Sequence, residues 1–201
     1  MFPVLTIILI FKTPTCMGNP NKSLNEDDIW VAIQAHEIGK SNSAFGFKDR
    51  LASENNWSTK FAEDAIQEYK RFMFLLCRCG HPVTPSVEID QVWHLHLLYT
   101  KDYWEIFADK LSLTPHHGPT RGGKAEASKF HEWYELTLSS YKRIFCEAPP
   151  ESFWPPSSVR FRENQNYKFI DISHMLVVPR KKAVSFCLVV VFALLVVLFF
   201  M

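Results

Sequence analysis

An uncharged, strongly apolar segment at residues 183–201 most restricts the structures that this chain can adopt. Its sequence, AVSFCLVVVFALLVVLFFM, contains one hydroxyl side chain, Ser185, and no charged residue. At 1.5 Å per residue, a helix of this length spans roughly 28 Å, close to the ~30 Å hydrocarbon core of a bilayer. The segment therefore predicts a C-terminal transmembrane helix. The alternative is a buried core helix, but such helices are usually shorter and amphipathic.

Basic residues flank this segment on one side only. Arg180, Lys181 and Lys182 precede it, and no basic residue follows it. Because Lys and Arg favour the cytoplasmic side of a membrane, the sequence predicts a single-pass, tail-anchored protein whose preceding domain is cytoplasmic. A second apolar run, FPVLTIILIF at residues 2–11, is too short to span a bilayer but long enough for the core of a signal peptide. If residues 1–15 act as a signal, the domain is exported instead. An interfacial segment or an extension upstream of the true start are the other interpretations.

The chain between these two apolar segments has the pattern of helices, most clearly after Ser58. That serine is a natural N-cap, and apolar residues follow it at three- and four-residue spacing until Gly80. The apolar stripe consists of Phe61, Ala65, Ile66, Tyr69, Phe72, Met73 and Leu76. A stripe of this width predicts a long helix with one face in the core.

Four further helices are expected around this one. The first is capped by Asn25, a second covers about residues 47–54, another begins with Pro85 and runs to about Asp109, and the last follows Gly123 and ends near residue 145. The prolines at 149–150 and 155–156 then require an extended segment, whose aromatic residues 153 and 154 are expected to pack back onto the helices. We therefore expect an all-α fold. Its parts are an apolar segment and linker (1–24), one multi-helix domain of about five helices (25–158), an irregular juxtamembrane linker (159–182) and the transmembrane helix (183–201).

Histidines concentrate in one stretch, residues 84–123, which holds four of the eight in the chain. On a helix, Asp90 and His94 share a face because they are four residues apart. His96 lies two residues beyond His94 and therefore about 200° away around the helix, so the two histidines cannot chelate one ion. This geometry predicts that His96 lies in the core with Trp93 and Tyr103.

Imidazole and carboxylate side chains together suit zinc, iron or manganese. The sequence therefore supports a divalent-metal site in which Asp90 and His94 meet His116 or His117 from the following loop. Two structural interpretations also fit. His94 could simply form a hydrogen bond with Asp90, and His96 could be a core histidine satisfied by a backbone carbonyl or a hydroxyl.

The loop after these histidines, HHGPTRGG, offers an anion site. Gly122 and Gly123 lie just before a predicted helix, whose N-terminus favours anions, and Arg121 adds a bidentate donor. A phosphate or carboxylate would suit this combination. The alternative is a tight turn between helices, with Arg121 paired to a nearby carboxylate such as Glu126.

Several motifs follow one another in a characteristic order: ENNWSTKFAEDAIQEYKRFMFL, HPVTPSVEIDQVWHLHLLYTKDYWEIF, HHGPTRGG and FHEWYELTLSSYKRIFCEAPPESFWP. With the D-x-x-W-H-x-H pattern at Asp90, Trp93, His94 and His96, they resemble the bacterial branch of the glycine-rich domain-containing protein-like family. The resemblance covers about residues 29–156 and implies a mainly helical domain. It supplies no established catalytic residues. The glycine-rich tail of the plant relatives is missing from this chain, which has seven glycines.

Two functions fit these features. The first is an interaction or ligand-binding module, held at the membrane by residues 183–201, with a protein partner. The second is a metal-dependent, hydrolytic enzyme that uses Asp90, His94 and the histidines at 116–117. The net charge of +1 gives no basic field, so a nucleic-acid partner is not expected.

Overall fold

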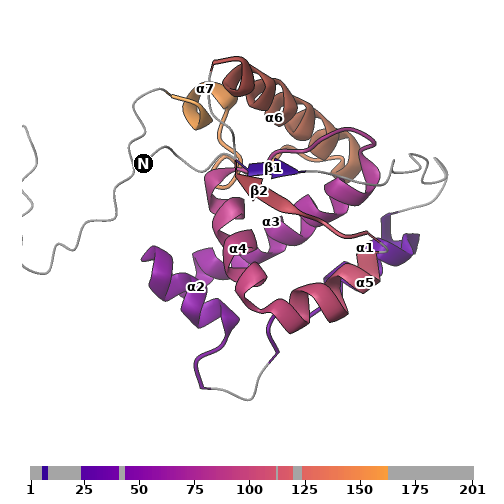
Figure 1. The fold of residues 1–201 in the computed structure, drawn as a ribbon, viewed down its shortest axis with the longest axis vertical. Coiled ribbons are helices and arrows are strands. Elements are labelled where there is room, and N and C mark those ends of the chain that lie inside the picture. The colour runs from indigo at the N-terminus through magenta and orange to yellow at the C-terminus, as the bar shows by residue number, and fades with distance from the viewer. Residues whose placement is uncertain (1–5, 9–23, 41–43, 112, 120–123, 163–201) are drawn as a thin grey trace, which may run out of the picture. The chain divides into compact units, whose positions relative to one another are not determined.

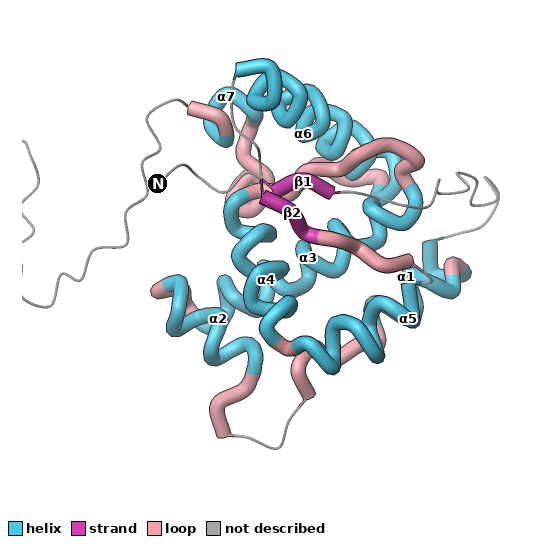
Figure 2. The backbone as a smooth tube through the Cα atoms, in the orientation of Figure 1, coloured by secondary structure: helices cyan, strands magenta, loops and turns pink. Residues whose placement is uncertain are grey.

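The structure, a computed structural model, describes residues 6–8, 24–40, 44–111, 113–119 and 124–162 (Figure 1). These residues are mainly helical, which confirms the all-α prediction for this part of the chain (Figure 2). The segments predicted as linker (163–182) and transmembrane helix (183–201), most of residues 1–24 and the Arg121–Gly123 loop lie outside the described residues. Among the described helices, none is long and apolar enough to cross a bilayer.

The helical elements follow the chain in a simple order, with two short strands added. The strands β1 (Thr6–Ile8) and β2 (His117–Pro119) pair antiparallel, with Ile7 opposite Gly118. The helices are η1 (Leu24–Glu26), α1 (Asp28–Gln34), α2 (Phe47–Asn55), α3 (Thr59–Arg78), α4 (Val87–Leu98), the π-helical η2 (Asp102–Phe107), α5 (Ala108–Leu111), α6 (Lys124–Phe145) and α7 (Ser157–Arg160).

The long helix α3 begins as its sequence predicts. The hydroxyl of Ser58 accepts a hydrogen bond from the Phe61 amide, the expected N-cap. The prediction that Asn25 caps the first helix is wrong. Asp27 is the cap: its Oδ1 accepts from the amides of Ile29 and Trp30. The physical reason is tertiary, because Arg78 at the end of α3 pairs with both carboxylate oxygens of Asp27 and holds them at the start of α1.

The prediction of one continuous helix from Pro85 to Asp109 is also wrong. Helix α4 begins two residues later, with Ser86 as its cap, and ends at Leu98. Tyr99 leaves the helical region (φ −86°, ψ 61°). The chain resumes as helix at Thr100 and is π-helical from residue 102. This break rotates the second half of the predicted helix, so that Asp102 faces back toward α4.

The core forms around α3, which contacts α1, α2, α4 and α6. Its largest fully buried side chains are aromatic: Trp93, Trp154, Tyr69, Tyr103, Tyr134 and Tyr141. As expected, the proline-rich segment after α6 packs back onto the helices. The Trp154 indole donates a 2.8 Å hydrogen bond to Glu68 Oε2 of α3, and the Phe153 ring packs at a tilt against that of Phe61. Helix α4 joins the same core through Trp93, whose ring lies 5.5 Å from that of Phe72 on α3 (centroid to centroid).

Candidate metal centre

Three of the predicted ligands meet on the surface of α4. His117 Nε2, from β2, donates a 2.9 Å hydrogen bond to Asp90 Oδ1. His94 Nε2 lies 3.7 Å from the other oxygen, Asp90 Oδ2. One ligand atom from each of the three residues lies within 4.8 Å of the others. The carboxylate therefore lies between two imidazoles, one from its own helix and one from the strand.

Helix geometry and strand pairing explain this convergence. Asp90 and His94 are four residues apart on α4, so the helix alone places them on one face. His117 is the first residue of β2, which pairs with β1 near α4 (Figure 2). Its ring lies edge-on to Trp93, with centroids 4.8 Å apart, and to His94, at 4.3 Å. The third ligand is thus brought in from 27 residues beyond Asp90.

The site is buried at one end and open at the other. The side chains of Asp90 and His117 are 6% and 7% exposed, whereas that of His94 is 37% exposed. Burial lowers the pKa of His94, an effect that Asp90 opposes and His117 reinforces. His94 is therefore mainly neutral at pH 7, which leaves an imidazole lone pair available for a metal ion.

The donor set suits a transition metal. Two imidazoles and one carboxylate are the ligands of non-haem iron sites, and three protein ligands plus water are typical of catalytic zinc. Metal–ligand bonds of about 2.1 Å place the ligand atoms of a tetrahedral ion roughly 3.4 Å apart. The His117–Oδ1 separation of 2.9 Å and the His94–Oδ2 separation of 3.7 Å involve different oxygens of Asp90. With one ligand atom from each residue, the three atoms lie within 4.8 Å of one another, so small side-chain movements would bring them to this spacing.

The other predicted site residues lie elsewhere. His116 is exposed, and its ring lies beside that of Trp104, with centroids 5.5 Å apart. Of the two neighbouring histidines, His117 is therefore the one that contacts Asp90. Arg121, Gly122 and Gly123 lie outside the described residues, and the anion site stays a prediction.

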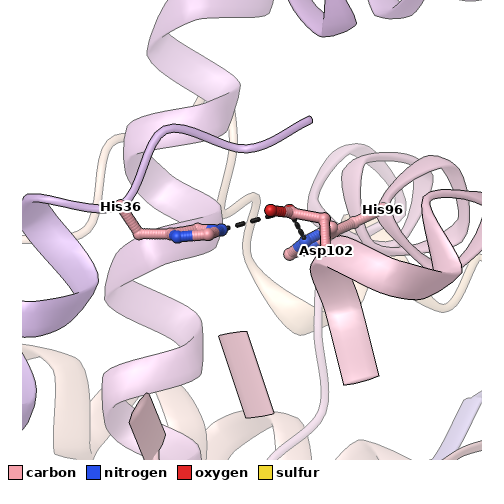
Figure 3. A group of neighbouring side chains, drawn as sticks. All are labelled: His36, His96 and Asp102. Carbon is pink, nitrogen blue, oxygen red and sulfur yellow. Dashed lines mark hydrogen bonds and ion pairs between the residues drawn. The ribbon is translucent and has the colours of Figure 1, made fainter. Parts of the chain in front are cut away.

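His96, Trp93 and Tyr103 are fully buried in the core. There His96 belongs to a second group, the Asp102 cluster, which sequence reasoning missed. Asp102 Oδ2 accepts hydrogen bonds from His36 Nε2 (3.1 Å), His96 Nε2 (2.8 Å) and the Gly39 amide (3.2 Å). Figure 3 shows His36 and His96 reaching Asp102 from different elements. No spacing rule links His36 to a residue 66 positions later, and the break at Tyr99 could not be anticipated, so the sequence carried no signal for this cluster.

The outer hydrogen bonds of the Asp102 cluster determine where its protons lie. Lys110 donates to His36 Nδ1 (3.0 Å), and the Tyr69 hydroxyl donates to His96 Nδ1 (2.9 Å). Each histidine therefore carries its proton on Nε2 and donates it to Asp102. A metal ion at this cluster would also lie close to the Lys110 ammonium, which pairs with His36. The nearby positive charge favours a hydrogen-bonded core network over a metal site.

Electrostatics within the cluster agree with these proton positions. Burial alone would raise the pKa of Asp102, but hydrogen bonds from His96 and Gly39, with His36 beside it, hold that pKa at about 2. Burial lowers the pKa of both His36 and His96, although Asp102 opposes the effect. The cluster is therefore an ionised carboxylate between two neutral histidines at pH 7.

No protein-family model, curated protein or solved structure matches this chain. The interpretation of both histidine groups accordingly depends on their geometry and chemistry.

Proposed function

We propose that this chain is a membrane-anchored helical domain that binds a divalent transition metal through Asp90, His94 and His117, as a ligand-binding module. The observation that carries the proposal is the convergence of these three side chains within 4.8 Å, with His94 open to solvent. The Asp102 cluster has the same residue types, but the Lys110 ammonium that pairs with His36 opposes a metal ion there. Zinc, manganese and iron fit the donor set of the proposed site.

Metal analysis of the full chain, purified in detergent without chelators, tests this proposal. We expect one equivalent of bound metal, and titration of the stripped protein with Zn²⁺ should raise its melting temperature, because a ligand that binds only the folded state stabilises it. His94→Ala should abolish the bound equivalent while leaving the unloaded fold intact, since this side chain is partly exposed. His131→Ala is the matched control, because His131 is an exposed histidine on α6. Absence of bound metal, with unchanged melting on adding Zn²⁺ or Mn²⁺, would refute the proposal.

A metal-dependent hydrolase is the second candidate function, and one observation favours it. Three side chains of the described residues could serve as ligands, and the partly exposed His94 leaves the outer side of the site accessible. Zinc held in this way can activate a bound water for attack on an ester, amide or phosphoester. The metal-loaded chain should then hydrolyse chromogenic substrates of one of these classes, and Asp90→Asn should remove that activity. Stoichiometric metal without turnover favours the module.

Membrane attachment through residues 183–201 belongs to the same proposal, with the helical domain on the cytoplasmic side. Its support is the uncharged apolar sequence and the basic residues at 180–182. A tag at either end, with protease accessibility measured in sealed vesicles, tests the topology. A domain protected on the lumenal side would instead favour export through residues 1–15.

The proposed membership of the glycine-rich domain-containing protein-like family rests on sequence motifs. Two residues of its D-x-x-W-H-x-H pattern, Asp90 and His94, belong to the proposed metal site, and two, Trp93 and His96, lie in the core beside it. A metal site in this chain would therefore assign a metal-binding role to Asp90 and His94 of this pattern.

A further inference from the structure

Two consecutive buried hydrogen bonds link α4 to the segment just before β2, the strand that begins with His117. The indole Nε1–H of Trp93 donates to the Tyr103 hydroxyl, and that hydroxyl donates to the carbonyl of Pro115, each over 2.8 Å. An indole can only donate and a carbonyl can only accept, so the direction of both bonds is fixed. Trp93 and Tyr103 are fully buried. Burial also raises the pKa of Tyr103, so its hydroxyl keeps the proton that it donates.

Both residues at the ends of these two hydrogen bonds, Trp93 and Pro115, influence the position of His117. Pro115 lies two residues before His117, so the bond from Tyr103 restrains the backbone that leads into β2. The ring of Trp93 meets the His117 ring edge-on, with centroids 4.8 Å apart. Trp93 itself lies on α4 between Asp90 and His94 in sequence. The two hydrogen bonds thus tie the third ligand to the helix that carries the other two.

The third ligand needs this restraint more than the others. Asp90 and His94 keep their relative positions through the backbone of one helix, whereas His117 comes from a three-residue strand. Metal sites lose affinity when a ligand is free to move, because binding must then order it, and the partners that orient ligands commonly change affinity by about 10- to 100-fold.

We propose that Tyr103 is a positioning residue for the metal ligand His117, acting through Pro115 and with Trp93 as its fixed support. The inference rests on the proposed metal-binding function. The proposal predicts that Tyr103→Phe weakens metal binding, although the hydroxyl that it removes is hydrogen-bonded to Trp93 and Pro115 and not to a metal ligand.

The fold supplies a matched control for this test. Tyr134 is also fully buried, and its hydroxyl also donates a 2.8 Å hydrogen bond to a proline carbonyl, that of Pro155. Tyr134→Phe therefore removes the same kind of bond at a site that carries none of the three proposed ligands. Both variants should lower the melting temperature of the unloaded protein, whereas only Tyr103→Phe should alter the metal site.

The experiment compares Tyr103→Phe, Tyr134→Phe and the wild type as full chains in detergent. Zinc affinity is measured by competition with a chromogenic chelator, and amide hydrogen exchange of residues 116–118 is measured without metal. We expect Tyr103→Phe to weaken zinc binding about 10- to 100-fold and to speed exchange in this segment, with Tyr134→Phe close to wild type in both. If Tyr103→Phe does not fold, Trp93→Phe is the second variant: it removes the hydrogen bond from Trp93 to Tyr103 and should also weaken zinc binding.

The outcomes separate the two proposals. If the wild type binds zinc but Tyr103→Phe binds it equally well with unchanged exchange, the positioning role is overturned and the metal site stands. Equal weakening by both tyrosine variants also overturns it, because the effect is then general destabilisation. If the wild type binds no zinc while exchange rises only in Tyr103→Phe, the metal function is overturned and the restraint on His117 stands.

Discussion

Replacing Asp102 with asparagine keeps the shape of the side chain and removes its charge, which isolates the contribution of the carboxylate to the Asp102 cluster. In the wild type, Oδ2 accepts from His36, His96 and the Gly39 amide. An uncharged amide oxygen is a weaker acceptor than a carboxylate oxygen. The substitution should therefore loosen the link between the end of α1 and η2 without creating a cavity.

The size of the effect follows from the pKa of Asp102, which falls from its ordinary 3.8 to about 2 in the folded protein. Each pKa unit corresponds to about 1.36 kcal/mol, so the fold favours the ionised form over the neutral one by about 2 kcal/mol. Asparagine resembles the neutral form, and Asp102→Asn should lower the free energy of unfolding at pH 7 by about this amount. The side chain is 14% exposed, so screening by solvent makes this an upper value.

Urea unfolding of the full chain in detergent, followed by circular dichroism, measures this difference. Asp64→Asn is the control, because Asp64 pairs with Lys60 on the exposed face of α3 and should cost no more than about 0.5 kcal/mol. Since the pKa of Asp102 is depressed, its contribution is complete above pH 3.8 and is lost as the pH falls toward about 2. The difference between wild type and Asp102→Asn should shrink over that range. An Asp102→Asn variant as stable as Asp64→Asn would refute the reasoning.

Three further predictions concern stability. Burial lowers the pKa of His36 and His96 below 6.5, so the unfolded protein binds protons at acidic pH that the folded protein does not. The urea midpoint of unfolding should therefore fall as the pH is lowered from 7.5 to 5.5, and a midpoint that does not change with pH would contradict this. Gly39→Ala should lower the free energy of unfolding by more than about 1–2 kcal/mol, because Gly39 has φ +60° and an added Cβ would lie 2.7 Å from the Tyr99 ring. Thermal melting measures this loss, and an unchanged melting temperature would argue against the close approach. Thr137→Val should lower the free energy of unfolding by about 1–3 kcal/mol, because the buried Thr84 amide loses the hydroxyl that accepts its 2.9 Å hydrogen bond. Thr137→Ser keeps a hydroxyl at this position and should lose much less stability in the same melting assay.

Much of the fold could be predicted from the sequence where local rules decide it. The N-cap at Ser58 and the apolar stripe after it define α3, because capping and helical periodicity depend only on neighbouring residues. The errors occur where a distant residue decides. Arg78 selects Asp27 as the cap of α1, and the chain breaks at Tyr99 where a continuous helix was expected.

The sequence by itself determined that Asp90 and His94 share a face and that His96 does not, since this follows from the 3.6-residue period of a helix. Only the tertiary structure decided that His117, rather than His116, completes this group, and that His96 meets Asp102. The physical reason is that contacts between distant segments depend on how the whole aromatic core packs, whereas the face of a helix depends on its backbone alone.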